Sequence, residues 1–148
     1  MKNSIFIRLI LSFLLLLGLF FPLIVQAEDE VQDSQYLNKV VLCRDVKENE
    51  PVFETSSFRP WDEKVVAWIR FSYQSQEPFM LTWEWVDPEG KIYHVGEIEM
   101  DSGEYKNYRT WYWISIWDHH AANILGDWKV RISVDENLLT IEEFSIEE

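Results

Sequence analysis

Cysteine is nearly absent from this 148-residue chain, which contains only Cys43. One cysteine cannot form an internal disulfide, so the fold depends on its apolar core. Cys43 lies in the strand-like apolar run 40–43, where we expect a buried and unreactive thiol; an intermolecular disulfide or a reactive thiol is the alternative. Glycine and proline are also scarce, with five of each, and the sequence shows no low-complexity tract and no internal repeat.

Basic residues are few, with 13 Lys and Arg against 26 Asp and Glu, and the formal net charge is −13. A field of this sign repels polyanions, and each phosphate contact needs a Lys or an Arg. We therefore do not expect nucleic acid as a partner. Solubility through self-repulsion is the simplest reason for the acidity, and attraction of cations is the alternative.

Catalytic and metal-binding motifs are missing. The sequence contains no GxSxG, HExxH or Cys–His signature, so we expect no enzyme and no catalytic residues, although paired carboxylates from distant strands would escape such a search. His119 and His120 follow Asp118, but consecutive residues of an extended chain point to opposite faces. We therefore expect neither a metal site nor a cofactor, and we predict that Asp118 caps a short helix.

The amino-terminal segment is typical of a secretory signal. Lys2 and Arg8 precede a long uncharged apolar run, and Val25-Gln26-Ala27 fits a signal-peptidase site. Cleavage after Ala27 would leave 11 basic and 26 acidic residues, a net charge of −15. The apolar run is longer than the apolar region of most signal peptides, so an uncleaved membrane anchor is the alternative. Both interpretations predict an exported domain, periplasmic or extracellular, that meets the membrane only through this segment.

We predict a signal peptide over 1–27, an acidic flexible leader over 28–38 and one domain over 39–148. Short β-type runs recur in the domain between turn signals, and no long helical pattern is present. This pattern predicts an all-β fold, a single antiparallel two-sheet sandwich of immunoglobulin-like type with about seven strands. The expected strands are 39–46, 64–73, 79–86, 91–100, 109–117, 128–134 and 138–146, with one short helical turn near 118–125.

Two local signals refine this prediction. Asp87-Pro88-Glu89-Gly90 is the strongest turn signal in the chain, and it should join 79–86 to 91–100 as a hairpin. Gly96 lies within the second of these strands, where the apolar face switches, and it predicts a β-bulge.

The segment 109–117 is apolar on both faces, although a sandwich strand needs only one apolar face for its core. One face carries Tyr112, Ile114 and Ile116, and the other carries Arg109, Trp111, Trp113, Ser115 and Trp117. The second face is either covered or exposed. The expected covers are the leader, the 118–126 turn or long side chains that lie over the rings.

An exposed second face would form an aromatic platform on which a sugar ring or a peptide side chain stacks. Trp111 and Trp113 would form it with Trp68 or Tyr93 from other strands, and Glu84 or Glu97 would accept hydrogen bonds from hydroxyl groups. The candidate ligand-binding residues are Trp111, Trp113, Arg109 and Trp68.

Five markers occur in a fixed order: Leu42-Cys43 with Pro51-Val52, Trp83-Glu84-Trp85, Arg109-Thr110-Trp111, Gly126-Asp127-Trp128-Lys129-Val130 and Phe144-Ser145-Ile146. In this order the chain resembles an uncharacterised bacterial family of exported or membrane-tethered β-sandwich domains that ends with a Gly-x-Trp-x-Val strand and a Phe-x-Val/Ile strand. The resemblance implies a fold and an envelope location but no site residue, because the family has no assigned activity. A His commonly precedes the mid-domain Trp in that family, whereas Thr82 precedes Trp83 here.

These observations predict a non-enzymatic exported protein of the bacterial cell envelope that binds a ligand, such as a glycan, through its aromatic-rich sheet face. The alternative is a protein–protein interaction module of the envelope, in which the same face meets another protein. A hydrolase with carboxylates from separate strands is the third hypothesis.

Overall fold

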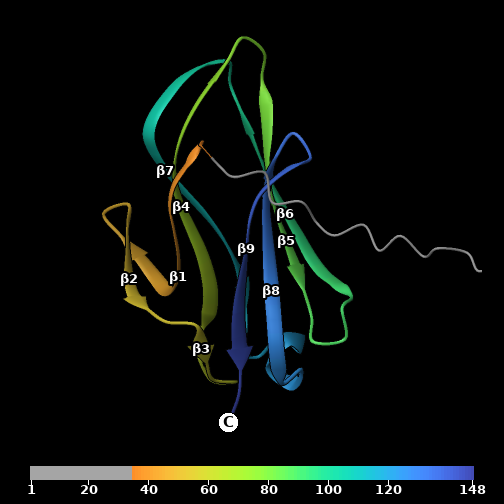
Figure 1. The fold of residues 1–148 in the computed structure, drawn as a ribbon. Coiled ribbons are helices and arrows are strands. Elements are labelled where there is room, and N and C mark those ends of the chain that lie inside the picture. The colour runs from red at the N-terminus through yellow and green to blue at the C-terminus, as the bar shows by residue number, and fades with distance from the viewer. Residues whose placement is uncertain (1–34) are drawn as a thin grey trace, which may run out of the picture.

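The computed structural model describes residues 35–148, which form two β-sheets that face each other (Figure 1). The predicted signal peptide and residues 28–34 of the predicted leader lie outside the described residues. The two sheets have the strand orders β2-β1-β4-β7 and β3-β9-β8-β5-β6. The strands are β1 (Leu37–Lys47), β2 (Glu50–Glu54), β3 (Ser57–Phe58), β4 (Lys64–Ser75), β5 (Phe79–Val86), β6 (Ile92–Met100), β7 (Gly103–Ser115), β8 (Gly126–Val134) and β9 (Asn137–Ile146). The prediction of an all-β two-sheet sandwich of immunoglobulin-like type is confirmed.

The details of the strands differ from the prediction in three ways. The described residues contain nine strands where about seven were expected, because β2 and β3 are too short and irregular to show an alternating pattern. The sheets are not wholly antiparallel, since β3 pairs with β9 in parallel. The first strand begins at Leu37, so Leu37 and Asn38 belong to the sandwich and not to the leader.

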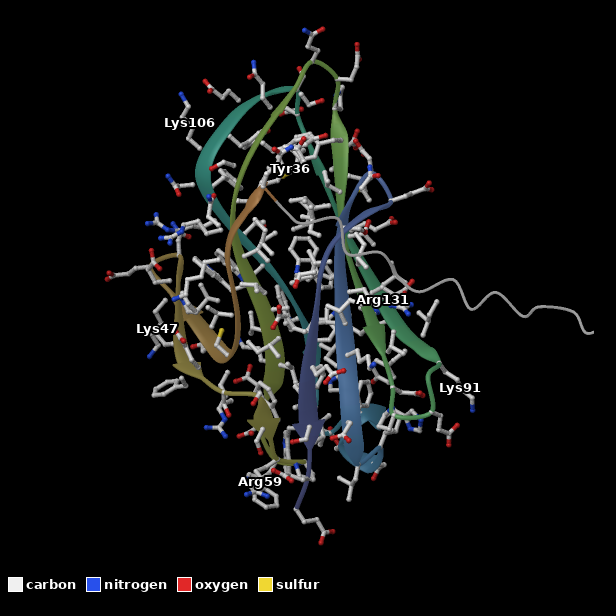
Figure 2. The ribbon with its side chains drawn as sticks, in the orientation of Figure 1. Tyr36, Lys47, Arg59, Lys91, Lys106 and Arg131 are labelled. Carbon is white, nitrogen blue, oxygen red and sulfur yellow. The ribbon has the colours of Figure 1, made fainter. Side chains whose placement is uncertain are left out.

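The core lies between the two sheets, where side chains from both layers meet (Figure 2). The inner face of β4 is the one expected from alternation, with Val65, Ala67, Ile69 and Phe71 all buried. The opposite sheet contributes Trp83, Trp85 and Trp128, each with none of its surface exposed. Burying a large side chain of this kind contributes roughly 1.5–3 kcal/mol. The indole N–H of Trp83 donates to the Ala67 carbonyl at 3.1 Å, and this bond links the two sheets.

The predicted 87–90 turn joins β5 and β6 as an antiparallel hairpin. The Asp87 carboxylate accepts bonds from the main-chain N–H groups of Glu89 and Lys91, each at 2.9 Å, and Gly90 has a φ of 80°. A side-chain acceptor and a residue with positive φ are what such a turn requires.

The prediction of a β-bulge at Gly96 is wrong. The register shifts between Trp85 and Val86, whose partners on β6 are His94 and Ile92, while Gly96 pairs regularly with Trp83. Gly96 instead makes room for a ring, because a Cβ atom there would lie 2.3 Å from the ring of Tyr112. A glycine in a strand can mark either a bulge or a close approach, and here it marks the second.

The predicted helical turn near 118–125 is a 3-10 helix of four residues, His120–Asn123. Its N-cap is His119 and makes no side-chain capping hydrogen bond, so the prediction that Asp118 caps the helix is wrong. Asp118 instead has a φ of 60°, where the chain leaves the sheet. Residues 35–148 contain no helix that is long and apolar enough to cross a membrane.

Candidate functional site

The four candidate residues lie on one face, the outer face of the β2-β1-β4-β7 sheet. Trp68 on β4 is the register partner of Trp111 on β7, and Arg70 is the partner of Arg109. Trp113, two residues along β7 from Trp111, shares its face. The structure therefore brings Arg109, Trp111, Trp113 and Trp68 together, as the sequence predicted.

The hairpin between β1 and β2 covers part of this outer face. Glu48 and Asn49 both have positive φ and connect the paired residues Lys47 and Glu50, which is the geometry of a tight two-residue turn. In the sheet order, β1 and β4 separate β2 from β7, yet the Glu50 carboxylate lies 2.7 Å from Nε of Arg109. This ion pair requires the hairpin to fold back over the face of the sheet.

Trp68 is covered by the same hairpin and has only 1% of its surface exposed. Its indole N–H donates to the Asn49 carbonyl at 3.0 Å. The prediction that Trp68 belongs to an exposed platform is therefore wrong. The covering element is also none of those expected from the sequence, because β2 carried no recognisable strand pattern. The outer face thus holds a second small core of Val41, Cys43, Val66 and Trp68, against which Val46 and Trp111 pack.

Cys43 lies in this second core as a free thiol with none of its surface exposed. Burial raises the pKa of the thiol from 9.0 to about 11, which keeps it protonated and unreactive. The nearby Asp45 has a lowered pKa, chiefly because the Lys64 ammonium donates a hydrogen bond to its carboxylate at 3.0 Å. The expectation of a buried cysteine is confirmed.

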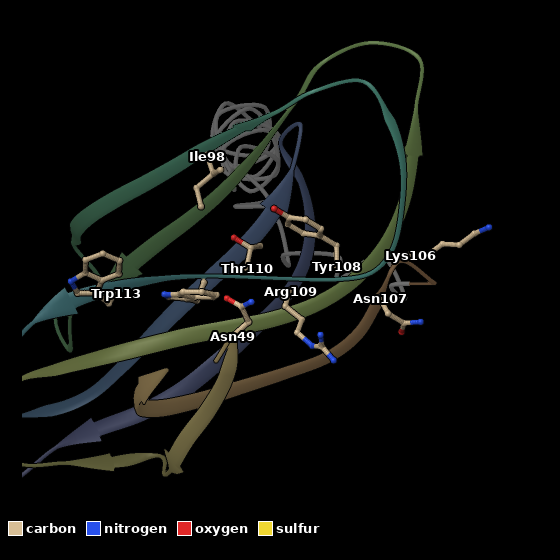
Figure 3. A pocket seen from close by; sticks show the side chains of 9 residues that line it. Asn49, Ile98, Lys106, Asn107, Tyr108, Arg109, Thr110 and Trp113 are labelled. Carbon is tan, nitrogen blue, oxygen red and sulfur yellow. The ribbon is translucent and has the colours of Figure 1, made fainter. Parts of the chain in front are cut away.

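Beyond the hairpin, the face opens into a groove of about 600 Å³ along β7, which we call the β7 groove (Figure 3). Trp113 and Tyr108 are exposed on 48% and 44% of their surfaces, and Trp111 is half-buried. The lining residues are Asn49, Ile98, Lys106, Asn107, Tyr108, Arg109, Thr110, Trp111 and Trp113. The groove therefore combines half-exposed aromatic rings with amide and cationic groups, the mixture typical of a ligand site.

The polar groups beside these rings differ from those expected. Glu84, Glu97 and Tyr93 lie on β5 and β6, and none of the three lines the groove, so the prediction that they assist the platform is wrong. Glu84 is paired there with Arg131 at 3.0 Å. Asn49 takes their place, and sequence reasoning missed it because only the folded hairpin brings it to β7. The feature of the sequence that could have indicated Asn49 is the short polar turn in which it lies, between two apolar runs.

The charged residues that line the β7 groove are both basic, and each forms an ion pair with a neighbouring carboxylate. Lys106 lies 3.0 Å from Glu104, and Arg109 is held by Glu50. The residues that line the groove include no carboxylate. Its arrangement is suited to holding a ligand by stacking and hydrogen bonding.

Trp117 does not lie on the strand face that carries Trp111 and Trp113, although the alternation of the sequence placed it there. The strand β7 ends at Ser115, and Trp117 lies beyond it, with 62% of its surface exposed. It lines a second hollow with Trp61, which the sequence analysis overlooked because Trp61 follows Pro60 outside any strand pattern.

The histidines do not converge on a metal site. His120 stacks on Tyr93 with ring centroids 6.5 Å apart, and His119 is the helix N-cap. His94 stacks on Tyr112 from β6, at 5.7 Å. Among residues 35–148, no three His, Cys, Asp or Glu side chains are grouped so that they could hold a metal ion.

No protein-family model matches the chain, and no curated protein matches it. Among solved structures, the chain is similar to an immunoglobulin-like protein from Pseudomonas aeruginosa, with 14% identity over 76% of this chain and 94% of that one and a TM-score of 0.48. It is also similar to the Pseudomonas fluorescens alkylpurine DNA glycosylase bound to DNA containing an abasic site analog, with 11% identity over 74% of this chain and 30% of that one and a TM-score of 0.44. The resemblance to an uncharacterised family of envelope β-sandwich domains rests on the sequence markers alone.

Proposed function

We propose that this protein is a non-enzymatic binding module of the bacterial cell envelope and that it holds a glycan in the β7 groove. The observation that carries the proposal is the exposure of Trp113. Its register partner Val66 is only 1% exposed, whereas Trp113 leaves 48% of its surface open beside a groove of about 600 Å³. Ligand sites are concave and lined by aromatic side chains, so exposed aromatic surface that lines a groove favours a binding site at this position.

The chemistry of the β7 groove suits a sugar. The apolar face of a pyranose ring can lie on the indole of Trp113, and its hydroxyl groups need donors and acceptors around the rim. The Asn49 and Asn107 side chains can supply both kinds of group. The guanidinium of Arg109 has five donors, of which the bond from Nε to Glu50 uses one. That ion pair also fixes the direction of the guanidinium, which reduces the entropy lost on binding.

Export is part of the proposal and is supported by the sequence. Lys2 and Arg8 ahead of the apolar run, with small residues at Val25 and Ala27, favour a cleaved signal peptide. The mature domain would then act in the periplasm or outside the cell, where glycans of the envelope are accessible.

A second candidate function is recognition of another envelope protein, and one observation favours it. Among residues 35–148, the 13-residue strand β7 is the last strand of its sheet and pairs only with β4. Its outer edge therefore presents main-chain donors and acceptors to which a strand of a partner could add. The side chains of Trp113 and Tyr108 would then contact side chains of the added strand.

The proposal is tested by titrating the purified domain with a soluble chitooligosaccharide and a maltooligosaccharide in a calorimeter. We expect at least one of them to bind, and Trp113→Ala to weaken that binding about tenfold or more, since a stacked aromatic anchor contributes about 1.4 kcal/mol or more. Trp61→Ala removes an indole outside the groove that is even more exposed, at 61% against 48% for Trp113, and serves as the matched control. Binding that survives Trp113→Ala would contradict the proposal. Concentration-dependent self-association that Trp113→Ala abolishes, without glycan binding, would favour the second candidate.

A further inference from the structure

The hollow beside Trp61 and Trp117 is built from segments that are far apart in the sequence, and we call it the Trp61–Trp117 hollow. It has a volume of about 550 Å³ and is lined by Pro60, Trp61, Trp117, Asp118, His119, His120, Ala122 and Asn123. Two main-chain bonds join its sides, from Trp117 N–H to Asp62 O at 3.1 Å and from Ile116 N–H to Glu63 O at 2.9 Å.

The floor of the Trp61–Trp117 hollow is anchored to the main core. His120 stacks on Tyr93, and Tyr93 makes an edge contact with the buried Trp128 at a centroid distance of 5.1 Å. The indole N–H of Trp128 donates to the Ile124 carbonyl at 3.0 Å, just after the 3-10 helix. A pre-formed site of this kind loses little conformational entropy when a ligand enters.

Two indoles flank the hollow and are left largely bare. Trp61 and Trp117 have 61% and 62% of their surfaces exposed, whereas four of the eight tryptophans are fully buried. The ring contacts found within residues 35–148 include no aromatic partner for either indole, and both side chains line the hollow. Exposed apolar surface that gathers at one hollow marks a site of interaction, whereas single exposed apolar side chains do not.

The charge of the Trp61–Trp117 hollow distinguishes it from the β7 groove. Its lining contains one carboxylate, Asp118, and no Lys or Arg, whereas Lys106 and Arg109 line the β7 groove. The nearest basic side chains in the sequence are engaged elsewhere. Arg59 donates to the main-chain oxygens of Glu147 and Glu148, and Lys64 pairs with Asp45 at 3.0 Å. The field of a chain with a net charge of −13 therefore favours a cation here and disfavours an anion.

We propose that the Trp61–Trp117 hollow binds an organic cation of the quaternary ammonium class. Tryptophan is the best of the side chains at attracting a cation over its ring face, and two such rings with a carboxylate form the recurring arrangement for methylated ammonium ions. The cationic methyl groups lie against the two indoles, and Asp118 supplies the compensating charge. This site is separate from the β7 groove and does not depend on the glycan proposal.

The test uses choline and its neutral isostere 3,3-dimethylbutan-1-ol, which has the same shape without the charge. Intrinsic tryptophan fluorescence and calorimetry follow the titration of the full domain. We expect choline to bind and the neutral isostere to bind about tenfold more weakly, because cation–π attraction to two rings exceeds the hydrophobic contribution that the two ligands share. Equal binding of the two ligands, or binding of neither, would overturn the proposal.

Variants locate the site. Trp61→Ala and Trp117→Ala should each weaken choline binding about fivefold or more, and Asp118→Asn should weaken it severalfold with a smaller dependence on salt. Trp113→Ala is the matched control, because it removes an exposed indole from the other site, and it should leave choline affinity unchanged. Loss of choline binding in Trp113→Ala alone would overturn the assignment. Both Trp61 and Trp117 are mostly exposed, so we expect their variants to keep the circular dichroism spectrum of the parent domain.

Quaternary ammonium groups occur as free solutes and as lipid headgroups, and co-sedimentation with phosphatidylcholine vesicles separates these sources. Binding to choline with vesicle co-sedimentation supports the proposal with a headgroup as the natural source. Binding to choline without co-sedimentation supports it with a free solute as the source. Binding of a neutral sugar at Trp61 and Trp117 in preference to choline would refute it.

Discussion

Replacement of Gly96 by alanine tests the close contact between β6 and β7, in which Gly96 leaves room for the ring of Tyr112. A Cβ atom at Gly96 would lie 2.3, 2.4 and 2.5 Å from three ring carbons of Tyr112. Favourable carbon contacts lie near 3.5–4.0 Å, so the ring would have to retreat by roughly 1 Å or more. The ring has little freedom to do so, because it stacks on Trp83 at 6.0 Å and on His94 at 5.7 Å.

The cost of this substitution follows from two contributions. Forcing extra atoms into a well-packed site costs about 1–3 kcal/mol, and disturbing a stacked aromatic pair costs about 0.5–1.5 kcal/mol. Alanine in place of glycine in an unobstructed strand would instead stabilise the fold by roughly 0.5–1 kcal/mol. We therefore expect Gly96→Ala to lower the free energy of unfolding by about 2 kcal/mol, the centre of the range that these contributions allow.

Urea unfolding followed by far-UV circular dichroism measures this change. With a slope of about 1–3 kcal/mol per molar urea, the midpoint should fall by roughly 1–2 M. The double variant Gly96→Ala, Tyr112→Ala supplies the control, since alanine at position 96 should cost nothing once the ring is gone. A midpoint that stays constant or rises in Gly96→Ala, or strict additivity in the double variant, would refute the reasoning.

Three further predictions concern the second core and its covering hairpin. Trp68→Phe removes the indole donor to the Asn49 carbonyl and leaves a void under the hairpin, so the free energy of unfolding in urea should fall by about 1–3 kcal/mol; no loss would mean that the hairpin does not seal this core. Glu50→Gln breaks an exposed ion pair with Arg109 and should cost less than about 1 kcal/mol, an amount that shrinks further as salt is added to the unfolding assay. Cys43 has its pKa raised to about 11 by burial, so between pH 9.0 and 11 the folded thiol holds a proton that the unfolded thiol has lost. The free energy of unfolding should therefore decrease as pH rises through this range, and an unchanged slope in Cys43→Ala would contradict this account.

Alternation and turn chemistry predicted most of the sandwich. The strand β8 carries one apolar face, so its core residues Trp128 and Val130 could be assigned from period-two spacing, and the same spacing placed Val65 and Ala67 of β4 together on the inner face. The β5–β6 turn could be placed from the sequence for two reasons. The Asp87 carboxylate can accept main-chain hydrogen bonds within a turn, and Gly90 can adopt a positive φ without strain.

The candidate site was predicted only in part, because its shape depends on a long-range fold of the chain. The side-chain period placed Trp68, Trp111 and Trp113 on one face, and that placement is confirmed. Burial of Trp68 could not be predicted, because β2 is a five-residue edge strand with a proline and no alternation, and only its folding over β7 covers the indole. The Trp61–Trp117 hollow was missed for a similar reason, since main-chain bonds between a loop and the end of β7 create it.

The central claim is that a glycan binds at Trp113 in the β7 groove, and indole N–H signals in a two-dimensional NMR spectrum test it most directly. The chain has eight tryptophans, so each indole reports on one place in the fold, with Trp83, Trp85 and Trp128 as buried references. On addition of a chitooligosaccharide or a maltooligosaccharide, the account predicts saturable shifts of Trp113 and the adjoining Trp111, with the buried indoles unmoved. Shifts confined to Trp61 and Trp117, or no saturable shift with any glycan, would contradict it.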